Sequence, residues 1–207
     1  MEVLNTLTTI NSRVKLRVWI DFICPFCLIG KELISNAIDG LNVDIEWVPF
    51  ELREYPVPTL RPEDEYLPKI WKQSVYPIAK QLGVDIRLPT ISPQPYTRNA
   101  FLLFYHAINH NKGDEYIDIT LRKFFQKNQD IGESMVLKEI MMELGLDPND
   151  FEAVLKSSKY MKLHDANLQE ARNIGINSVP SIGIGDLVIS GIPNQERLRE
   201  MLLNQLS

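Results

Sequence analysis

A strand–helix–strand pattern near the N-terminus constrains the fold more than any other feature. The stretch VKLRVWIDF (14–22) is rich in β-branched and aromatic residues and predicts a strand, and VDIEWVPFEL (43–52) predicts a second. Between them, Pro25 suits the first position of a helix because its φ angle is fixed and it has no N–H. The helix is expected to run to about Ala37. A helix of this length between two strands predicts that the strands pair in parallel.

A block of helices then interrupts the pattern. Residues 53–62, REYPVPTLRP, are rich in proline and are not expected to form regular structure. After them, glycines and capping residues mark the ends of several amphipathic stretches. The helices are predicted at 64–82, 97–111, 114–127 and 134–144, with Gly83, Gly113 and Gly145 as C-cap glycines, followed by a helix from Asp147-Pro148 that runs, with a break, to Ile174.

Strand patterns return after Gly175. SVPSIGIGDLVISG predicts two short strands joined by a tight turn at Gly185-Asp186, and NQERLREMLLNQL predicts a closing amphipathic helix. The sequence therefore predicts an α/β fold with a large all-helical insertion. The α/β domain is discontinuous and takes residues 1–60 plus 158–207, and the helical insertion takes residues 61–157. Residues 1–12 are polar and aperiodic and predict a loose arm.

Charge and hydropathy argue against several kinds of partner. The net charge is −5, so the chain offers no excess of basic residues for nucleic acid or an anionic membrane. Its apolar runs are shorter than the roughly 18 residues that span a bilayer. The N-terminal stretch lacks the basic and apolar regions of a secretory signal, so we expect a cytoplasmic location. In the cytoplasm a close cysteine pair is more often catalytic or metal-binding than a structural disulfide.

The only two cysteines, Cys24 and Cys27, lie at the junction of the first strand and the first helix. The thiolate is the reactive form of cysteine, and the unpaired N–H groups and dipole of a helix N-terminus favour negative charge. A disulfide between these positions would close a tiny loop, which stabilises a fold by at most about 2 kcal/mol. Such a disulfide would stabilise the fold only weakly and would be easily reduced. The spacing alone leaves three interpretations open: a redox pair, half of a metal site, or two buried core thiols.

A metal site has little support in the rest of the sequence. Structural zinc needs four ligands, and the chain supplies only two thiols. His106 and His110 are spaced for one helix face, but we expect them on the helix surface and predict no metal. The position of the cysteines within a strand–helix–strand unit instead favours a thioredoxin-like redox motif.

Val179-Pro180 is a second candidate element, about 150 residues after the cysteines in the sequence. A residue before proline is restricted to extended geometry, and proline at the start of a strand donates no ladder hydrogen bond. A simple strand boundary would explain the pair. If the peptide bond is cis it is a placed feature, and the backbone of Val179 would then be free to pair with an extended substrate.

Three motifs in this order, DFICPFCLIGK, EWVPFEL and SVPSIGIGDLVISG, resemble the DsbA-like thioredoxin-fold family and are most similar to its FrnE-like cytosolic branch. The resemblance covers residues 14–205. It implies a thiol–disulfide oxidoreductase that uses no organic cofactor or metal and that allows glutathione as a co-substrate. Implied substrates are disulfide-containing proteins or small-molecule thiols, together with a reducing or oxidising partner that the sequence does not identify.

The resemblance also implies a role for individual residues. Cys24 would be the exposed attacking thiol and Cys27 the resolving thiol. Pro180 would be a cis-proline that faces them. Pro25, Phe26, Val179 and Pro180 would contact the substrate, and the proline-rich loop from 88 to 97 would line the groove beside the cysteines.

Two positions depart from the strongly oxidising members of the family. Phe26 stands where those proteins have a histidine that holds the thiolate, and Val18 stands where they have a buried glutamate. The nearest acid is Asp21, three residues before Cys24. Asp21 either relays protons to Cys27 or accepts hydrogen bonds from the start of the helix, as capping acids do, and capping is favoured.

Two alternative functions remain. The kappa-class glutathione transferases and hydroxychromene-carboxylate isomerases resemble this chain in layout, but those isomerases use a serine near the place of Cys24 and activate glutathione. The presence of both cysteines favours the oxidoreductase. The other alternative is a non-catalytic module that binds thiols or zinc.

Overall fold

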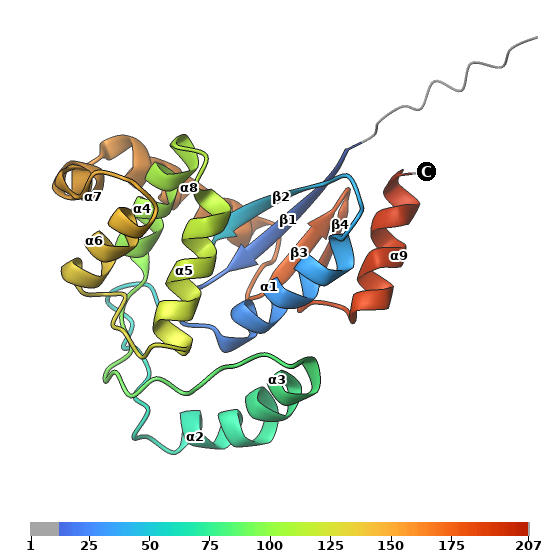
Figure 1. Cartoon of the computed structure of the whole chain (residues 1–207), viewed down its shortest axis with the longest axis horizontal. Coiled ribbons are helices and arrows are strands. Elements are labelled where there is room, and N and C mark those ends of the chain that lie inside the picture. Colours follow the sequence, from blue (N-terminus) through green and yellow to red (C-terminus); the bar gives the residue numbers. More distant parts are fainter. Residues whose placement is uncertain (1–12, 207) are drawn as a thin grey trace, which may run out of the picture.

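The computed structural model describes residues 13–206, so the arm expected at 1–12 lies outside the described residues. Four strands form one mixed sheet in the order β2-β1-β3-β4 (Figure 1). β1 pairs in parallel with β2, and β3 is antiparallel to both of its neighbours. The two ends of the chain thus build one sheet, as predicted. The bounds are β1 Val14–Ile20, β2 Val43–Pro49, β3 Ser181–Ile184 and β4 Leu187–Ser190.

Helices cover both faces of the sheet. Side chains alternate across β1, so Arg17 points to one face, where it donates two hydrogen bonds to Glu170 of α8 (Ser158–Asn173). Leu16 and Val18 are fully buried on the other face, where α1 (Pro25–Ile38) packs against α9 (Gln195–Leu206) (Figure 1). This layering places the start of α1 at the end of β1, near the centre of the sheet.

The helical insertion lies between β2 and α8 in the chain, as predicted. Its helices bury an aromatic-rich core with many fully enclosed rings. The division into two domains at residues 60 and 157 stays a prediction. The elements are α2 Tyr66–Ile70, the π-helical segment η1 Trp71–Val75, α3 Tyr76–Leu82, α4 Arg98–Asn109, α5 Gly113–Phe125, α6 Ser134–Glu143, the 3-10 turn η2 Pro148–Asp150 and α7 Phe151–Leu155.

Several predicted boundaries change. The helix expected at 64–82 contains a π-helical turn at Trp71–Val75, and both of these end residues are buried. Gly113 is wrong as a C-cap, because it is the first residue of α5 and Asn111, with φ 58°, takes the left-handed position. The break expected in the last insertion helix falls before α8, where Ser157 accepts a capping hydrogen bond from the Tyr160 amide.

The strands are shorter than predicted at their C-terminal ends. The β1–β2 ladder stops at the pair Ile20 and Pro49, where the Phe50 amide donates to the Ile20 carbonyl at 2.9 Å. The predicted hairpin turn at Gly185-Asp186 is confirmed, and Gly185 has a positive φ of 57°. Within residues 13–206, no helix combines the length and apolar character needed to cross a membrane.

Candidate active site

The two cysteines lie on the first turn of α1. Cys24 is the N-cap residue, with φ −90° and ψ 114°, and Pro25 occupies the first helical position, as predicted. The Cys24 amide donates to the Asp21 carbonyl at 3.1 Å, and the Cys27 amide donates to the Cys24 carbonyl at 3.0 Å. Both cysteines are free thiols in this structure. The turn therefore holds two thiols side by side at the positive end of the helix dipole.

The Val179-Pro180 segment faces this turn. The Cys24 thiol donates to the Val179 carbonyl at a Sγ–O distance of 3.2 Å, across 155 positions of sequence. The peptide bond between Val179 and Pro180 is cis. The Val179 N–H has no hydrogen-bond acceptor among residues 13–206, and the Pro180 carbonyl accepts from the Gly191 amide at 2.8 Å. The fold thus brings an unpaired backbone donor next to the first thiol.

Both thiols are more enclosed than expected. The exposed fraction is 5% for Cys24 and 1% for Cys27, so the prediction that Cys24 is exposed is wrong. The Val179 carbonyl contacts the Cys24 sulfur. Cys24 nevertheless forms part of the wall of a cavity of about 300 Å³, together with Pro25 and Phe26. The same cavity is also lined by Leu52 and Arg53 of the loop after β2. Cys24 therefore borders a space that is large enough for a small molecule.

Asp21 is fully buried beside the thiols. Its Oδ2 accepts from the Leu52 amide at 2.7 Å, so the carboxyl group ties the end of β1 to the loop after β2. The favoured prediction that Asp21 caps the helix is wrong, because Cys24 is the N-cap and its side chain makes no cap bond. Oδ1 lies near Thr97 but has no hydrogen bond of normal geometry with a described residue.

This environment changes the acidity of both buried groups. Burial raises the pKa of Asp21 to about 7, against the opposing effect of the hydrogen bonds, and the nearby charge of Glu51 adds to the rise. Burial also raises the pKa of the Cys27 thiol well above its usual value, and contacts with Cys24 add to it. The Asp21 amide, 3.5 Å from Cys27 Sγ, works in the opposite direction. A carboxyl group that titrates near neutral pH therefore sits next to a thiol that holds its proton firmly.

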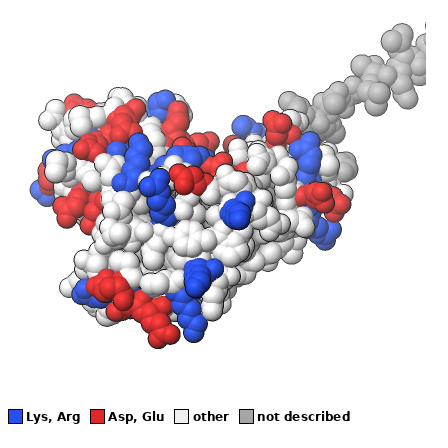
Figure 2. Space-filling model, turned by 60° about the horizontal axis from the view of Figure 1, so that its bottom comes forward, with Lys and Arg blue, Asp and Glu red and all other residues white. Residues whose placement is uncertain are grey.

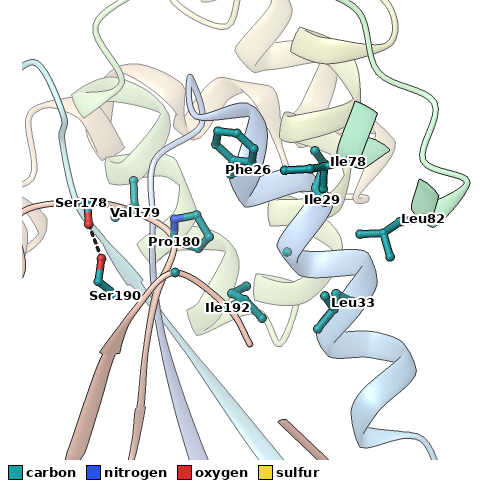
Figure 3. A pocket seen from close by; sticks show the side chains of 12 residues that line it. Phe26, Ile29, Leu33, Ile78, Leu82, Ser178, Val179, Pro180, Ser190 and Ile192 are labelled. Carbon is teal, nitrogen blue, oxygen red and sulfur yellow. Dashed lines mark hydrogen bonds between the residues drawn. The ribbon is translucent and has the colours of Figure 1, made fainter. Parts of the chain in front are cut away.

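A second cavity, of about 320 Å³, lies on the other side of Phe26 and is shown in Figure 3. We call it the proline-side groove because Val179 and Pro180 form one wall. Its other walls are apolar side chains of α1, α3 and the segment after β4. Gly30 leaves room for Ile192, because a Cβ there would overlap Ile192 Cδ1 and would force that side chain to shift. The labelled apolar residues that line the groove are Phe26, Ile29, Leu33, Ile78, Leu82 and Ile192.

The face that carries α2 and α3 is poor in charge. Figure 2 turns this face toward the viewer and shows an uncharged area interrupted by a few lysine or arginine side chains, with a band of acidic and basic side chains below it. Ile78 and Leu82 of α3 are 39% and 44% exposed beside the proline-side groove. This face therefore offers mainly apolar side chains at the groove.

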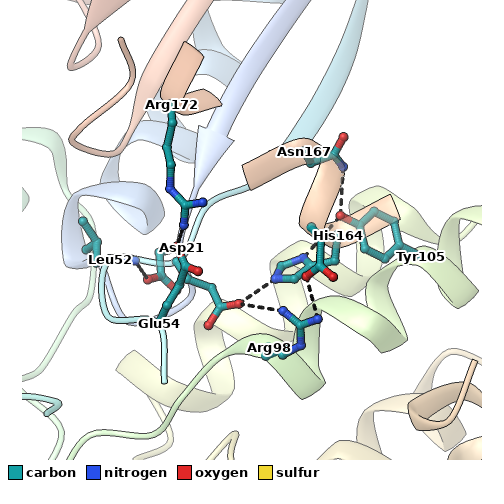
Figure 4. A network of polar contacts seen from close by, with 10 residues as sticks. Asp21, Leu52, Glu54, Arg98, Tyr105, His164, Asn167 and Arg172 are labelled. Carbon is teal, nitrogen blue, oxygen red and sulfur yellow. Dashed lines mark hydrogen bonds and ion pairs between the residues drawn. The ribbon is translucent and has the colours of Figure 1, made fainter. Parts of the chain in front are cut away.

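A buried polar network lies on the other side of Asp21 and was missed by the sequence analysis (Figure 4). His164 is fully buried and its Nε2 donates to Glu51 Oε1 at 2.6 Å. Arg98 lies 3.9 Å from the same Glu51 oxygen. Tyr105 contacts His164 Nδ1 at 3.4 Å and accepts from Asn167 at 2.8 Å. No sequence motif links these residues, because helix α8 and the loop after β2 meet only in the fold.

The histidine pair considered for zinc is not next to the cysteines. His106 is 8% exposed, so its predicted surface position is wrong, whereas His110 is exposed. Their rings lie 4.5 Å apart, and His106 Nε2 is 3.8 Å from Asp150. Within the described part of the chain, no group of three or more histidine, cysteine, aspartate or glutamate residues could hold a metal ion.

The predicted lining by the loop at 88–97 holds for one residue. Gln94, which is 3% exposed, forms part of the wall of the cavity that contains Cys24. Neither proline of this loop near Gln94 lines that cavity or the proline-side groove. The loop therefore contributes a polar side chain, which sequence analysis did not single out.

Comparison with known proteins gives consistent matches over nearly the whole chain. The model of the DSBA-like thioredoxin domain matches residues 15–203. The chain is 40% identical over 185 residues to YwbO, an uncharacterised protein of Bacillus subtilis (strain 168). The aligned residues make up 88% of this chain and 92% of YwbO.

Two solved structures share the fold. A probable DsbA oxidoreductase from Streptomyces coelicolor has a TM-score of 0.76 at 20% identity and covers 93% of this chain and 90% of that one. A hydroxychromene-carboxylate isomerase has a TM-score of 0.74 at 17% identity, with 92% and 93% covered. Together with the four-stranded sheet and the helical insertion, these matches show a DsbA-like thioredoxin fold.

Proposed function

The chain belongs to the DSBA-like thioredoxin domain family, and from this premise we propose that it is a thiol–disulfide oxidoreductase that acts through Cys24 and Cys27. The observation that carries the proposal is the 3.2 Å contact between Cys24 Sγ and the Val179 carbonyl, with Cys27 on the same helical turn. This contact holds the first thiol against a backbone segment that can receive a substrate.

The proposed reaction proceeds through a mixed disulfide. The Cys24 thiolate attacks one sulfur of a substrate disulfide, bonds to it and releases the other sulfur as a thiolate. The Cys27 thiolate then attacks Cys24 Sγ, which releases the reduced substrate and forms the Cys24–Cys27 disulfide. The reverse sequence oxidises a dithiol substrate.

Asp21 is proposed as the group that takes the Cys27 proton. Cys27 attacks only as a thiolate, and burial disfavours that form. The raised pKa of Asp21, about 7, lets its carboxyl group accept a proton and return it near neutral pH. This role replaces the helix cap that the sequence favoured.

Substrates are proposed to bind on both sides of Phe26. A backbone carbonyl of an extended polypeptide can accept a hydrogen bond from the free Val179 N–H, as in strand addition. The side chains of the polypeptide then enter the proline-side groove. The proposed substrates are disulfide-containing proteins or small thiols, with glutathione as a co-substrate and a separate redox partner. Membership of the FrnE-like branch and a cytoplasmic location also remain proposals.

The test measures the dithiol–disulfide equilibrium of the purified protein in glutathione buffers, by mass after alkylation. We expect a reversible Cys24–Cys27 disulfide. A potential near about −270 mV would indicate a reductant, and one near about −120 mV an oxidant. Cys24→Ser should abolish turnover, and its matched variant Cys27→Ser should accumulate the mixed disulfide.

Three outcomes would contradict the proposal. Turnover by the Cys24→Ser protein would show that another group does the chemistry. Saturable glutathione binding, with no internal disulfide at any ratio of reduced to oxidised glutathione, would favour the isomerase or transferase alternative. Two unreactive thiols with stoichiometric zinc would favour the binding module.

A further inference from the structure

The cavity that contains Cys24 differs from the proline-side groove in its polar groups. We call it the Arg53 cavity. Most of its wall is apolar and comes from Ile23, Phe26, Leu60, Leu67, Ile70, Trp71 and Val75. Its polar side chains are Tyr66 of α2, Arg53 from the loop after β2 and Gln94 from the loop before α4.

Neither Arg53 nor Gln94 has a side-chain partner among the described residues. Gln94 is 3% exposed, and its side-chain amide makes no hydrogen bond with the described residues. Arg53, which is partly buried, makes no hydrogen bond or ion pair with them either. The Gln94 amide atoms are still accessible to solvent, so they are open to the space of the cavity rather than sealed in its wall. An amide and a guanidinium that are both without a protein partner at one apolar cavity therefore offer two groups that can hold a polar ligand.

Part of the apolar wall has an unusual backbone. Trp71 and Val75 belong to the π-helical segment, and both are almost fully buried. A π-helical turn is frequent at functional sites because it shifts the register of a helix face. Here the turn contributes a large indole and a small side chain to the same cavity wall.

We propose that the Arg53 cavity binds one half of a small disulfide that has an apolar body and a single carboxylate, with Arg53 and Gln94 holding the carboxylate. This inference rests on the proposed thiol–disulfide function and names its substrate class. The cavity volume of about 300 Å³ suits a small molecule. An extended peptide fits it poorly, because the apolar wall cannot satisfy one N–H and one C=O per residue.

The chemistry balances with a thiol as reductant. Cys24 attacks the sulfur of the bound half, so that this half is joined to Cys24 and the other half leaves as a thiolate. Cys27 attacks Cys24 Sγ, the bound half leaves as a second thiolate, and the internal disulfide forms. Two molecules of a cellular monothiol, or one dithiol, then supply two electrons and two protons to restore the Cys24 and Cys27 thiols.

The test uses the reduced full-length protein and two aromatic disulfides. Dithiobis(nitrobenzoate) carries a carboxylate on each ring, and dithiodipyridine is its uncharged counterpart. Arg53→Gln should slow the first reaction about tenfold relative to the second, because a charge-assisted pair to the carboxylate is lost. Any effect of Arg53 on the Cys24 thiolate changes both rates equally and cancels in the ratio. Gln94→Leu should change the ratio in the same direction.

Matched controls separate the cavity from general charge effects. Arg87→Gln removes an exposed arginine that is not in the cavity wall, and it should leave the ratio within about twofold, as surface charges contribute little. Leu60→Trp narrows the Arg53 cavity, whereas Ile192→Trp narrows the proline-side groove. We expect Leu60→Trp to slow dithiobis(nitrobenzoate) more than insulin, and Ile192→Trp to do the reverse.

The outcomes distinguish this inference from the proposed function. If the internal disulfide forms but Arg53→Gln leaves the ratio of rates unchanged, the substrate class is wrong and the oxidoreductase proposal stands. If the ratio falls but no internal disulfide ever forms, the cavity binds the carboxylate and the oxidoreductase proposal fails. Arg53 is partly exposed, so its variant should fold even if Leu60→Trp does not.

Discussion

Two buried carboxyl groups, Asp21 and Glu51, lie at the ends of paired strands but have opposite surroundings (Figure 4). Glu51 accepts from His164 at 2.6 Å and has Arg98 at 3.9 Å. Asp21 accepts a hydrogen bond of normal geometry from the Leu52 amide, at 2.7 Å, has Thr97 and the Ile23 amide nearby, and has no cation beside it in the described part of the chain. The difference indicates that the first site holds the structure together and the second is kept reactive at a cost in stability.

The two sites are joined through the backbone. Leu52, whose amide donates to Asp21, directly follows Glu51, which His164 fixes against helix α8. The paired site therefore positions the hydrogen-bond donor of the unpaired one. If this division is correct, mutations at the two carboxyl sites should change stability in opposite directions.

The largest expected effect is at the paired site. His164→Ala should lower the free energy of unfolding by about 3–5 kcal/mol, because it leaves the buried Glu51 without its hydrogen-bonded partner. Chemical denaturation near neutral pH measures this. The matched control is His110→Ala, an exposed histidine whose loss should change stability by no more than about 0.5 kcal/mol. Equal effects of the two substitutions would show that Glu51 does not depend on His164.

At Asp21, which has no partner cation among the described residues, we expect a mutation to change stability in the opposite direction. The pKa of Asp21 is raised from 3.8 to about 7 in the folded protein, so the folded state binds its proton more tightly than the unfolded state. Stability from this group is full below about pH 4 and is lost as the pH rises to about 7. Asp21→Asn should therefore stabilise the protein by about 2–4 kcal/mol near pH 8 and have little effect near pH 4.

Denaturation of the wild type and Asp21→Asn across this pH range measures the difference. Asparagine keeps an oxygen to accept the Leu52 amide, so the comparison isolates the charge. A variant that is destabilised equally at both ends of the range would mean that the carboxyl group contributes through packing. In that case the contrast with Glu51 would disappear.

Local patterns in the sequence were sufficient to predict the fold and to single out the thiol pair. The positions of Cys24, Pro25 and the hairpin turn follow from short-range rules for helix starts and tight turns, and the structure confirms their local geometry. Asp21 was singled out because it lies close to Cys24 in the sequence. Its role depends on the loop that buries it, so the favoured prediction of a helix cap was wrong. A short-range rule cannot report the burial of a side chain.

The residues that sequence analysis missed meet only through long-range packing. His164 and Glu51 are 113 positions apart, and each alone resembles an ordinary polar residue on a helix or in a loop. Arg53 and Gln94 come from two irregular loops that share one cavity. Their unpaired state becomes visible only once the hydrogen bonds of the folded chain are known.

The smallest expected effect concerns the rate of the resolving step. In Asp21→Asn the nearby group can no longer take the Cys27 proton, so the mixed disulfide on Cys24 should resolve about tenfold more slowly near neutral pH, at the low end of general base catalysis. Rapid quenching with acid, followed by mass analysis of the intermediate, measures this rate. Hydroxide deprotonates Cys27 directly, so the difference from wild type should shrink as the pH rises. A structural role for Asp21 would instead slow resolution by the same factor at every pH. The pH dependence therefore separates a reactive carboxyl group from one that, like Glu51, serves only to hold the fold.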